Sequence, residues 1–389
     1  MRVGFVVSQF PLLSETFVIS QMEGLLARGF EVGVICDTVM DTHPDRQREP
    51  LSSLIRNTRL WWSSARLQRA VDRLPYGLRY KVAALLDLRF GGKLNDYDVI
   101  IAHFGKNGAR VARAKRMGRT RTPVVTIFHG YDVGVPFKDN KCREYADLFR
   151  NGDLHLTVNK VFRDMLIESG AEAKKVAVHR MGVDVTRIPY TPRTRTEGAV
   201  RFVSVCRLVE KKGIEFALRA FAHETLRGTD WRYDIIGGGP LTSELEALAT
   251  KLGIRDRVTF AGSLPHDEVK RRLHDYHAFI LPSITSRTGD MEGVPVALME
   301  AMASGLPVIS SYHSGIPELI TDGETGFLAP ERDHEALAAR ILQVIADPAS
   351  CDRIVAAARA KIEADHDNAA LDDRIAAILN DLARQRAGQ

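Results

Sequence analysis

This 389-residue sequence is poor in cysteine and has no long apolar run. Its four cysteines stand without paired spacing, which argues against both a disulfide framework and a zinc site. No apolar run approaches the ~20 residues of a membrane-spanning helix. The first residues also lack the apolar core and small-residue cleavage site of a signal peptide. We therefore expect a cytoplasmic protein from a reducing compartment.

Local catalytic signatures are missing as well. The chain contains no HExxH, no GxSxG, no P-loop and no GxGxxG dinucleotide fingerprint. Asp96 and Asp98 form a DxD, a spacing that holds a divalent metal in some sugar transferases, but they precede a predicted strand and are interpreted as turn residues. The net charge of +5 is mild, and its distribution matters more than its sum. We expect no metal, no cofactor and no nucleic-acid partner.

What the sequence does contain is a long alternation of short apolar strands and amphipathic helices. This alternation predicts α/β structure with parallel sheets covered on both faces, and the length suits two domains. A break with two prolines at 185–200 is interpreted as a linker. The predicted strands are 2–7, 31–36, 98–103, 124–129 and 154–158 before the break, and 202–206, 233–237, 258–262, 279–283, 307–311 and 325–329 after it, with only helices beyond 333.

One segment departs from this rhythm. Residues 46–93 carry eleven Arg/Lys and three Asp/Glu, a net charge of +8. At helical spacing Leu60 and Leu67 share one face with further apolar residues, arginines flank it, and Trp61 and Trp62 lie beside it. A basic amphipathic helix with tryptophan is typical of segments that lie on an anionic membrane surface. A helical insertion that packs its leucines and exposes its arginines is the alternative.

Two loops of the second half follow predicted strands, at the sheet edge where open parallel sheets bind ligands. Arg207 and Lys212 lie between strand 202–206 and the next helix, where two cations and a helix N-terminus would suit a diphosphate. Gly238 follows strand 233–237 in a glycine run that would let the backbone approach a ligand closely. A solvated basic turn and a plain tight turn are the respective alternatives.

Two glutamates bracket the start of a predicted helix at 295–304. Pro295 is favoured at a first helical turn, because its missing N–H would be unpaired there. Glu292 therefore lies in the loop before the helix and Glu300 inside it. The pair is then not an acid–base couple on one helix face, and the free N–H groups of residues 293–296 are placed to receive phosphate or sugar hydroxyls.

The first half offers fewer candidates. Ser14 is a good N-cap for a helix predicted over 15–29, and Glu15 suits the positive end of its dipole. His129 ends a predicted strand and precedes a glycine, which favours ligand contact over a core position. His103 ends another predicted strand and is a weaker parallel.

Together these motifs resemble a known family. The stretch GDMEGVPVALMEAMASGLPVISS (289–311) resembles the donor-site signature of the retaining GT-B glycosyltransferases of family 4. RLVEKKG (207–213), IIGGGP (235–240) and GIPELITDGETGFL (315–328) resemble three further patterns of that family, the first of them its diphosphate-binding loop. FPLLSETF (10–17) and AHFG (102–105) resemble its bacterial exopolysaccharide branch, of the colanic-acid and amylovoran type.

The resemblance implies the GT-B fold, in which two Rossmann-like domains face each other across a cleft. An acceptor-side domain would cover 1–190, including the basic insertion 46–93. A donor-binding domain would cover 200–365, and a last helix within 366–389 would cross back to the first domain.

The resemblance also implies a role for each candidate. The donor would be bound by Arg207, Lys212, Gly238, Leu264, Asp290, Gly293, Val294, Pro295 and Glu300. The two cations would hold the diphosphate, Glu300 the ribose, and the backbone near Leu264 the base. His129 and Glu292 would be catalytic at the donor sugar, with Ser14, Glu15 and His103 on the acceptor side. Many family members carry a Gly-Gly loop where this chain has SQFPLLSE (8–15), so Ser14 either replaces that phosphate contact or faces the acceptor.

The implied function is a retaining, metal-independent transfer of a hexose from a UDP- or GDP-sugar, which is a substrate and not a cofactor. The acceptor would be a saccharide linked to polyprenyl diphosphate, in exopolysaccharide synthesis at the inner face of the plasma membrane. A sugar-nucleotide epimerase or hydrolase and a non-catalytic partner subunit are the alternatives. Replacing Lys212 or Glu300 by alanine is predicted to weaken nucleotide binding and leave the fold intact.

Overall fold

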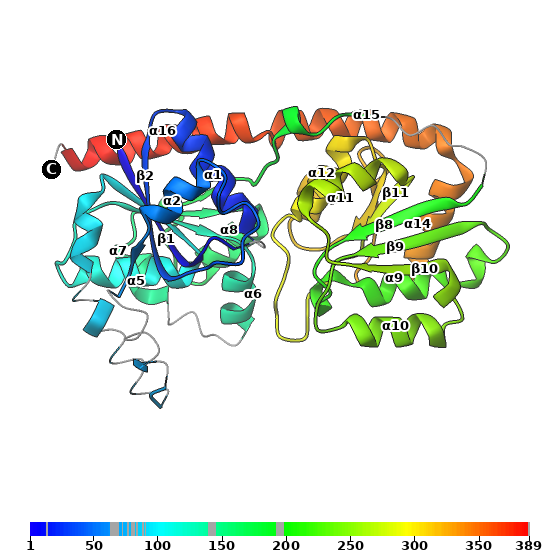
Figure 1. Ribbon diagram of the computed structural model, residues 1–389, viewed down its shortest axis with the longest axis horizontal. Helices are drawn as coiled ribbons and strands as arrows, with labels where there is room; N and C mark the ends of the chain where they lie inside the picture. Colours follow the sequence, from blue (N-terminus) through cyan, green and yellow to red (C-terminus); the bar gives the residue numbers. More distant parts are fainter. Residues whose placement is uncertain are drawn as a thin grey trace. The chain divides into compact units, whose positions relative to one another are not determined.

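The computed structural model describes residues 1–12, 15–62, 70–71, 73–75, 78, 82, 85–87, 89, 91–138, 145–191 and 198–387. The chain divides into two compact units (Figure 1): unit 1 is Met1–His179 with Asn368–Gln389, and unit 2 is Arg180–Asp367. The first division lies before the 185–200 segment that was interpreted as a linker. Unit 1 is therefore built from two separate stretches of chain, and unit 2 from one.

Unit 1 is a parallel sheet with helices on both faces. Its described strands run in the order β3-β2-β1-β4-β5-β6-β7, and every neighbouring pair is parallel. The strands are β1 (Arg2–Phe10), β2 (Glu31–Val39), β3 (Arg59–Leu60), β4 (Val99–His103), β5 (Val124–Phe128), β6 (Leu154–Thr157) and β7 (Val176–Val178). The helices are α1 (Thr16–Ala27), α2 (Leu51–Arg56), α5 (Gly105–Arg116), α6 (Tyr131–Lys138), α7 (Ala146–Asn151), α8 (Lys160–Glu168) and α16 (Asn368–Ala387), with 3₁₀ turns η2 (Gly91–Asp96) and η4 (Ala173–Lys175).

Side-chain alternation along β1 decides which helices cover which face of this sheet. Phe5 points to a core that includes Met22 of α1 and Leu379 of α16. Val6 points to the opposite core, which includes Val111 of α5. Because successive strand residues face opposite sides, one short apolar run can bury both faces. In Figure 1, α1 and α16 accordingly lie on one side of the sheet and α5 on the other.

Unit 2 repeats the plan with the strand order β10-β9-β8-β11-β12-β13, again parallel throughout its described strands. The strands are β8 (Val200–Val205), β9 (Trp231–Ile236), β10 (Val258–Gly262), β11 (Ala278–Leu281), β12 (Val308–Ser311) and β13 (Phe327–Ala329). The helices are α9 (Ile214–Phe221), α10 (Thr242–Lys251), α11 (His266–Arg272), α12 (Val296–Ser304), α13 (Ile316–Leu319), α14 (His334–Ala346) and α15 (Pro348–Asp365), with 3₁₀ turns η5 (Val185–Arg187), η6 (Glu210–Lys212), η7 (Glu224–Leu226), η8 (Arg255–Arg257) and η9 (Leu273–Asp275).

The predicted strands are confirmed, with small shifts at their ends, and so is the helical character of the chain beyond 333. Pro295 is the N-cap residue of α12, and Gly305 ends that helix with a left-handed φ of 85°, a conformation that glycine adopts without a steric penalty. The long amphipathic helix predicted within 46–93 is wrong at its start, because Leu60 belongs to β3. Leu67 and its flanking arginines Arg66 and Arg69 lie outside the described residues. Within the described chain, no helix is both long and apolar enough to cross a bilayer.

Candidate active site

The charged residues predicted for the second half, except Glu300, lie in turns and loops that follow the unit 2 strands. Lys212 follows β8 in the short turn η6, and Glu292 lies in the loop between β11 and α12. The Lys212 Nζ atom is 2.8 Å from Glu292 Oε1, and the two side chains are only 16% and 8% exposed. The fold thus brings together the predicted diphosphate lysine and the predicted sugar-contacting glutamate as a buried ion pair.

A second lysine completes this cluster. Lys211 Nζ lies 3.1 Å from Asp290 Oδ1 and 3.9 Å from Glu292 Oε1. Burial opposes ionisation of Glu292, but the two lysines outweigh it and lower the pKa of that carboxyl. Burial likewise opposes the charge on Lys212, but Glu292 raises its pKa overall. Two lysines and two carboxyl groups thus face one another in this cluster.

Arg207 contrasts with the two lysines. It lies at the end of β8, is exposed, and has no ion pair within the described part of the chain. The backbone N–H groups of Val296 and Ala297, in the first turn of α12, also find no partner among the described residues. An unmatched guanidinium and the free N–H groups of a helix start are the groups that bind anions in proteins.

Glu300 lies inside α12 and has one partner. Its Oε1 is 2.8 Å from Nε2 of His266, the first residue of α11, and the carboxyl side chain is 13% exposed while the imidazole is 50% exposed. Leu264, two residues before His266, packs partly buried on the unit 2 core. The candidates for ribose and base thus lie around the start of α11.

The glycine run after β9 is explained by the backbone next to it. The Gly238 carbonyl accepts the N–H of Leu208 at 2.9 Å. A Cβ on Gly237, whose φ is 135°, would lie 1.8 Å from the Cys206 carbonyl oxygen, and one on Gly239 would lie 2.4 Å from that of Leu208. These glycines let the loop after β9 pack against the loop that carries Arg207, and a Cβ at either flanking position would force the two loops apart.

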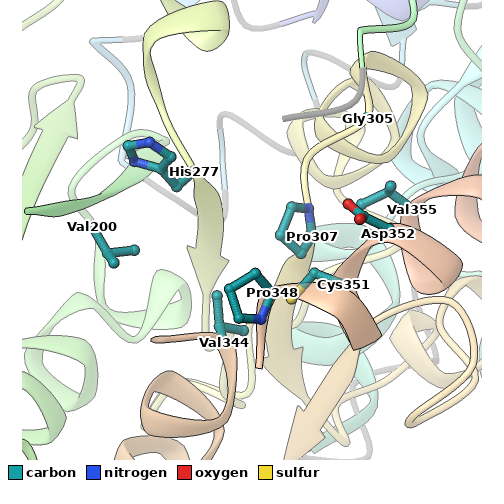
Figure 2. Close-up of a pocket in the computed structure, with 9 residues that line it drawn as sticks. All are labelled: Val200, His277, Gly305, Pro307, Val344, Pro348, Cys351, Asp352 and Val355. Carbon is teal, nitrogen blue, oxygen red and sulfur yellow. The ribbon is translucent and has the colours of Figure 1, made fainter. Parts of the chain in front are cut away.

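A separate cavity opens at the other end of the unit 2 strands, near their amino termini (Figure 2). Val200, which begins β8, and Pro307, which precedes β12, lie on its wall, together with Cys351 of α15. Because these residues mark the amino ends of the strands, the cavity does not coincide with the predicted donor residues, none of which lines it.

In unit 1 the two predicted histidines are neighbours. His103 Nδ1 lies 2.9 Å from His129 Nε2, and the rings stack with centroids 5.2 Å apart. Phe17 of α1 contacts both rings, and Phe104 contacts that of His129. Burial lowers the pKa of His103 to about 3 and lowers that of His129 well below its ordinary value. Both imidazoles are therefore neutral at neutral pH, and one donates its proton to the other.

A buried carboxylate fixes the loop that carries His129. Asp132 Oδ1 accepts the backbone N–H groups of His129 and Gly130, each at 3.0 Å, and Oδ2 accepts that of Gly105 at 2.8 Å. Burial raises the pKa of Asp132, against the effect of these three donors. Asp132 thereby ties the loop after β5 to the loop after β4, and so holds the two histidines together.

The remaining acceptor-side candidates are less defined. Glu15 is the N-cap residue of α1, the position predicted for Ser14, so it precedes the first turn in which it was expected, and its side chain makes no capping bond. Burial raises the pKa of Glu15 to about 7. Ser14 lies outside the described residues.

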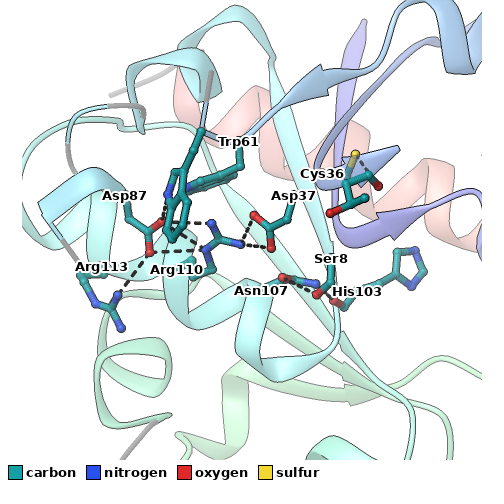
Figure 3. A network of polar contacts seen from close by, with 11 residues as sticks. Ser8, Cys36, Asp37, Trp61, Asp87, His103, Asn107, Arg110 and Arg113 are labelled. Carbon is teal, nitrogen blue, oxygen red and sulfur yellow. Dashed lines mark hydrogen bonds and ion pairs between the residues drawn. The ribbon is translucent and has the colours of Figure 1, made fainter. Parts of the chain in front are cut away.

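The two tryptophans of the basic segment are buried, and Figure 3 shows Trp61 beside Asp87 and Arg110. Trp61 and Trp62 are 2% and 6% exposed, and both indole N–H groups donate to Asp87 Oδ1, at 2.7 and 2.8 Å. Arg110 of α5 donates to both carboxylate oxygens of Asp37 and to Asp87, with its guanidinium 4.6 Å from the Trp61 ring centre. This network attaches the insertion to the domain, so neither tryptophan is available to a membrane surface.

Several residues of the site were missed from sequence. The prediction named Lys212 but not the adjacent Lys211, and it named His129 but not Asp132. His313 lies two residues past the end of β12, followed by Ser-Gly, and accepts the backbone N–H of Glu292 at 3.0 Å. The signal applied to His129 was a histidine at the end of a predicted strand with a glycine after it, and His313, two residues past the predicted strand 307–311 and two before Gly315, matches it approximately.

The fold is that of glycosyltransferases of known structure. The chain aligns with the lipopolysaccharide outer core galactosyltransferase WaaB at a TM-score of 0.73 and 20% identity, covering 98% of this chain and 100% of the other. It aligns with Anabaena HepE in complex with UDP at a TM-score of 0.78 and 18% identity, with the same coverage. These likenesses establish the GT-B architecture of two parallel-sheet α/β domains.

Sequence relatives then define the family. The profile "Glycosyltransferase Family 4" matches residues 14–187, and "Glycosyl transferases group 1" matches residues 192–361. The chain is 36% identical over 405 residues to the "Putative colanic acid biosynthesis glycosyltransferase" of Salmonella typhimurium, covering 97% of this chain and 99% of the relative. It is 34% identical over 408 residues to the amylovoran biosynthesis glycosyltransferase of Erwinia amylovora, covering 98% and 100%. The chain belongs to glycosyltransferase family 4, and is an enzyme that transfers a sugar from a nucleotide-sugar donor.

Proposed function

We propose that this enzyme moves a hexose from a UDP- or GDP-sugar to a saccharide acceptor, with retention of anomeric configuration and without a metal ion. The observation that carries the proposal is the buried Lys212–Glu292 pair, 2.8 Å apart. The exposed Arg207 and the unpaired N–H groups at the start of α12 support it.

The leaving group is a nucleoside diphosphate on which negative charge grows as the glycosidic bond breaks. The exposed Arg207 contacts the diphosphate from the solvent side, while Lys212 is held in place by Glu292. Fixed cations need little reorganisation during the reaction, and one such contact typically contributes about 3 kcal/mol to transition-state stabilisation. These cations supply the stabilisation that a metal ion provides in other transferases.

The rest of the donor lies along α12 and the start of α11. Glu300 accepts ribose hydroxyls, which replace or join its contact with His266. The backbone near Leu264 contacts the base. Glu292 binds hydroxyls of the donor sugar, with Asp290 and the backbone of residues 293–295 beside it.

Unit 1 supplies the acceptor side and the reaction centre. His129, neutral and hydrogen-bonded to His103, contacts the donor sugar near the reacting carbon. Glu15, whose pKa is raised to about 7, binds an acceptor hydroxyl and exchanges a proton with it near neutral pH. Ser14 belongs to the same side.

The acceptor is a saccharide carried on polyprenyl diphosphate, and the product enters an exopolysaccharide or surface polysaccharide. The names of the relatives in colanic acid and amylovoran biosynthesis support the exopolysaccharide product. Peripheral attachment of segment 46–93 to an anionic membrane would then occur through its arginines, because both tryptophans are buried. Flotation with anionic vesicles checks it: binding at low salt that disappears at high salt is expected, and no binding at low salt refutes it.

A donor screen tests the proposed function. Titration calorimetry with UDP, GDP, UDP-glucose and GDP-mannose is expected to show binding in one nucleotide series, and turnover to depend on an added saccharide acceptor. Rapid donor consumption without acceptor would instead indicate a hydrolase or epimerase. Absence of binding in both series would refute the proposal.

A further inference from the structure

A histidine–carboxylate pair contacts the backbone of Glu292, on the protein side of the Lys212–Glu292 cluster. His313 is fully buried, and its Nε2 atom lies 3.0 Å from the backbone nitrogen of Glu292. Its Nδ1 atom lies 2.6 Å from Glu331 Oε1. The other carboxylate oxygen of Glu331 accepts the backbone N–H of Thr285 at 2.8 Å. One imidazole and one carboxylate thus connect the loops that follow β11, β12 and β13.

The hydrogen bonds determine the tautomer of His313. A backbone N–H can only donate, so Nε2 must present its lone pair to Glu292. The single ring proton of the neutral imidazole then lies on Nδ1 and is donated to Glu331. A carboxylate that accepts this proton increases the basicity of the opposite ring nitrogen, as it does for histidines that bind metals. The acceptor presented to the Glu292 N–H is therefore both fixed in place and strengthened.

The position of Glu292 depends on this contact. The loop from residue 282 to 295 has no regular secondary structure, and within the described chain His313 is the acceptor that holds the Glu292 N–H. The side chain of the same residue reaches Lys212. A shift of the Glu292 backbone would move both its carboxylate and the following start of α12.

We propose that His313 and Glu331 are positioning residues that hold Glu292 in its productive place at the sugar end of the donor site. This inference rests on the proposed function, because it assigns Glu292 to the donor sugar. The pair acts through the Glu292 main chain and touches no substrate. Misplacement of a reacting or binding group by about 1 Å can reduce a rate by about a hundredfold, so the pair controls turnover of the nucleotide sugar more than affinity for the nucleotide.

Two substitutions at one position separate the two hydrogen bonds. The amide of His313→Asn lies where Nδ1 was and keeps the contact to Glu331, but it cannot reach the Glu292 N–H. The amide of His313→Gln extends to the former position of Nε2 and keeps an acceptor for that N–H. Glu331→Gln removes the charge behind His313 and leaves one acceptor oxygen where the carboxylate had two, so either the Nδ1–H of His313 or the backbone N–H of Thr285 loses its partner. Tyr312→Phe is the matched control, because Tyr312 is the adjacent residue and is 51% exposed.

The assays use the full-length protein with UDP, GDP, UDP-glucose and GDP-mannose, and compare the affinity for nucleotide, the affinity for nucleotide sugar and the slow hydrolysis of donor. For His313→Asn we expect unchanged nucleotide affinity, about tenfold weaker binding of the nucleotide sugar through one lost hydrogen bond, and about a hundredfold slower hydrolysis through misplacement of Glu292. His313→Gln should stay within about fivefold of wild type on all three, because the Glu292 N–H keeps its acceptor. Glu331→Gln should fall between them, and Tyr312→Phe should match wild type.

The outcomes distinguish this inference from the function on which it rests. If the wild-type chain binds neither nucleotide series, the proposed function fails and the inference fails with it. If wild type binds but His313→Asn and His313→Gln lose nucleotide and nucleotide-sugar binding equally, His313 is only structural and the inference alone is overturned. If His313→Asn does not fold, His313→Gln and Glu331→Gln decide: the inference requires near-normal turnover in the first and reduced turnover at normal nucleotide affinity in the second.

Discussion

Replacing Lys212 by methionine should destabilise unit 2, although sequence reasoning predicted that this lysine could be removed with the fold intact. Methionine keeps the length of the side chain and removes its charge, which leaves the Glu292 carboxylate buried without its 2.8 Å partner. Removing one member of a buried ion pair typically costs about 3–5 kcal/mol. Lys211, 3.9 Å from the same carboxylate oxygen, compensates in part, so we expect a loss of about 3 kcal/mol.

The pH dependence of this loss can be stated in advance. In wild type the pKa of Glu292 lies below its ordinary value of 4.5, so the pair stabilises the fold above that pH and loses its effect as the pH falls through the lowered pKa. Without Lys212, burial dominates and the pKa of Glu292 rises above its ordinary value. The penalty is then largest at neutral pH and shrinks as the pH falls and the carboxyl takes up a proton.

Scanning calorimetry of the two proteins at pH 7.5 and pH 5 measures the effect. For a unit of this size, about 3 kcal/mol corresponds to a fall of roughly 6–12 °C in the melting temperature. Adding Glu292→Gln to the Lys212→Met variant should restore part of the loss, because the uncompensated charge is then absent. A melting temperature equal to wild type at pH 7.5, or a deficit that is the same at both pH values, would refute the argument.

Three further predictions follow from contacts described above. Arg207→Ala should weaken nucleotide binding by about tenfold to a hundredfold, the range for a charge-assisted contact; calorimetric titration with UDP and GDP measures this affinity. The melting temperature should not change, because Arg207 is exposed, and thermal unfolding checks it. Glu300→Ala should also weaken nucleotide binding at little cost in stability, since its partner His266 is half-exposed, and equal affinity for wild type and variant would remove Glu300 from the ribose site. Asp87→Ala should destabilise unit 1 by about 3 kcal/mol, because it leaves Arg110 with Asp37 alone, whose side chain is 18% exposed. A calorimetric change below about 1 kcal/mol would contradict the anchoring role of that network.

The fold was predictable from sequence because its signals are local. Each strand is a short apolar run, and α12 is bounded by Pro295 and Gly305, whose backbone preferences act within a few residues. The parallel direction of the strands could also be expected, since parallel strands need crossover helices, but their order in each sheet could not. The helix proposed at Leu60 failed because the pairing of Arg59–Leu60 with β2 is a tertiary effect that helical periodicity does not contain.

The site was predictable only one residue at a time. Position at or after the end of a predicted strand identified Lys212, Glu292 and His129, because that position depends on neighbouring sequence. Which side chains neutralise one another was not predictable, since Lys212 and Glu292 are far apart in the chain and meet through the order of the strands. The same applies to Trp61, for which membrane contact and a packed insertion were both open from sequence, because its burial depends on contacts such as that with Asp87.

The return of α16 to unit 1 has a consequence for biosynthesis. Met22 and Leu25 of α1 bury themselves against Ile375 and Leu379 of α16, and Arg28 forms an ion pair with Asp373. A ribosome makes those α16 residues only after the whole of unit 2 has been translated. Until then, the apolar face of α1 has no α16 to pack against. Unit 1, although its first stretch is synthesised earlier, completes its core last.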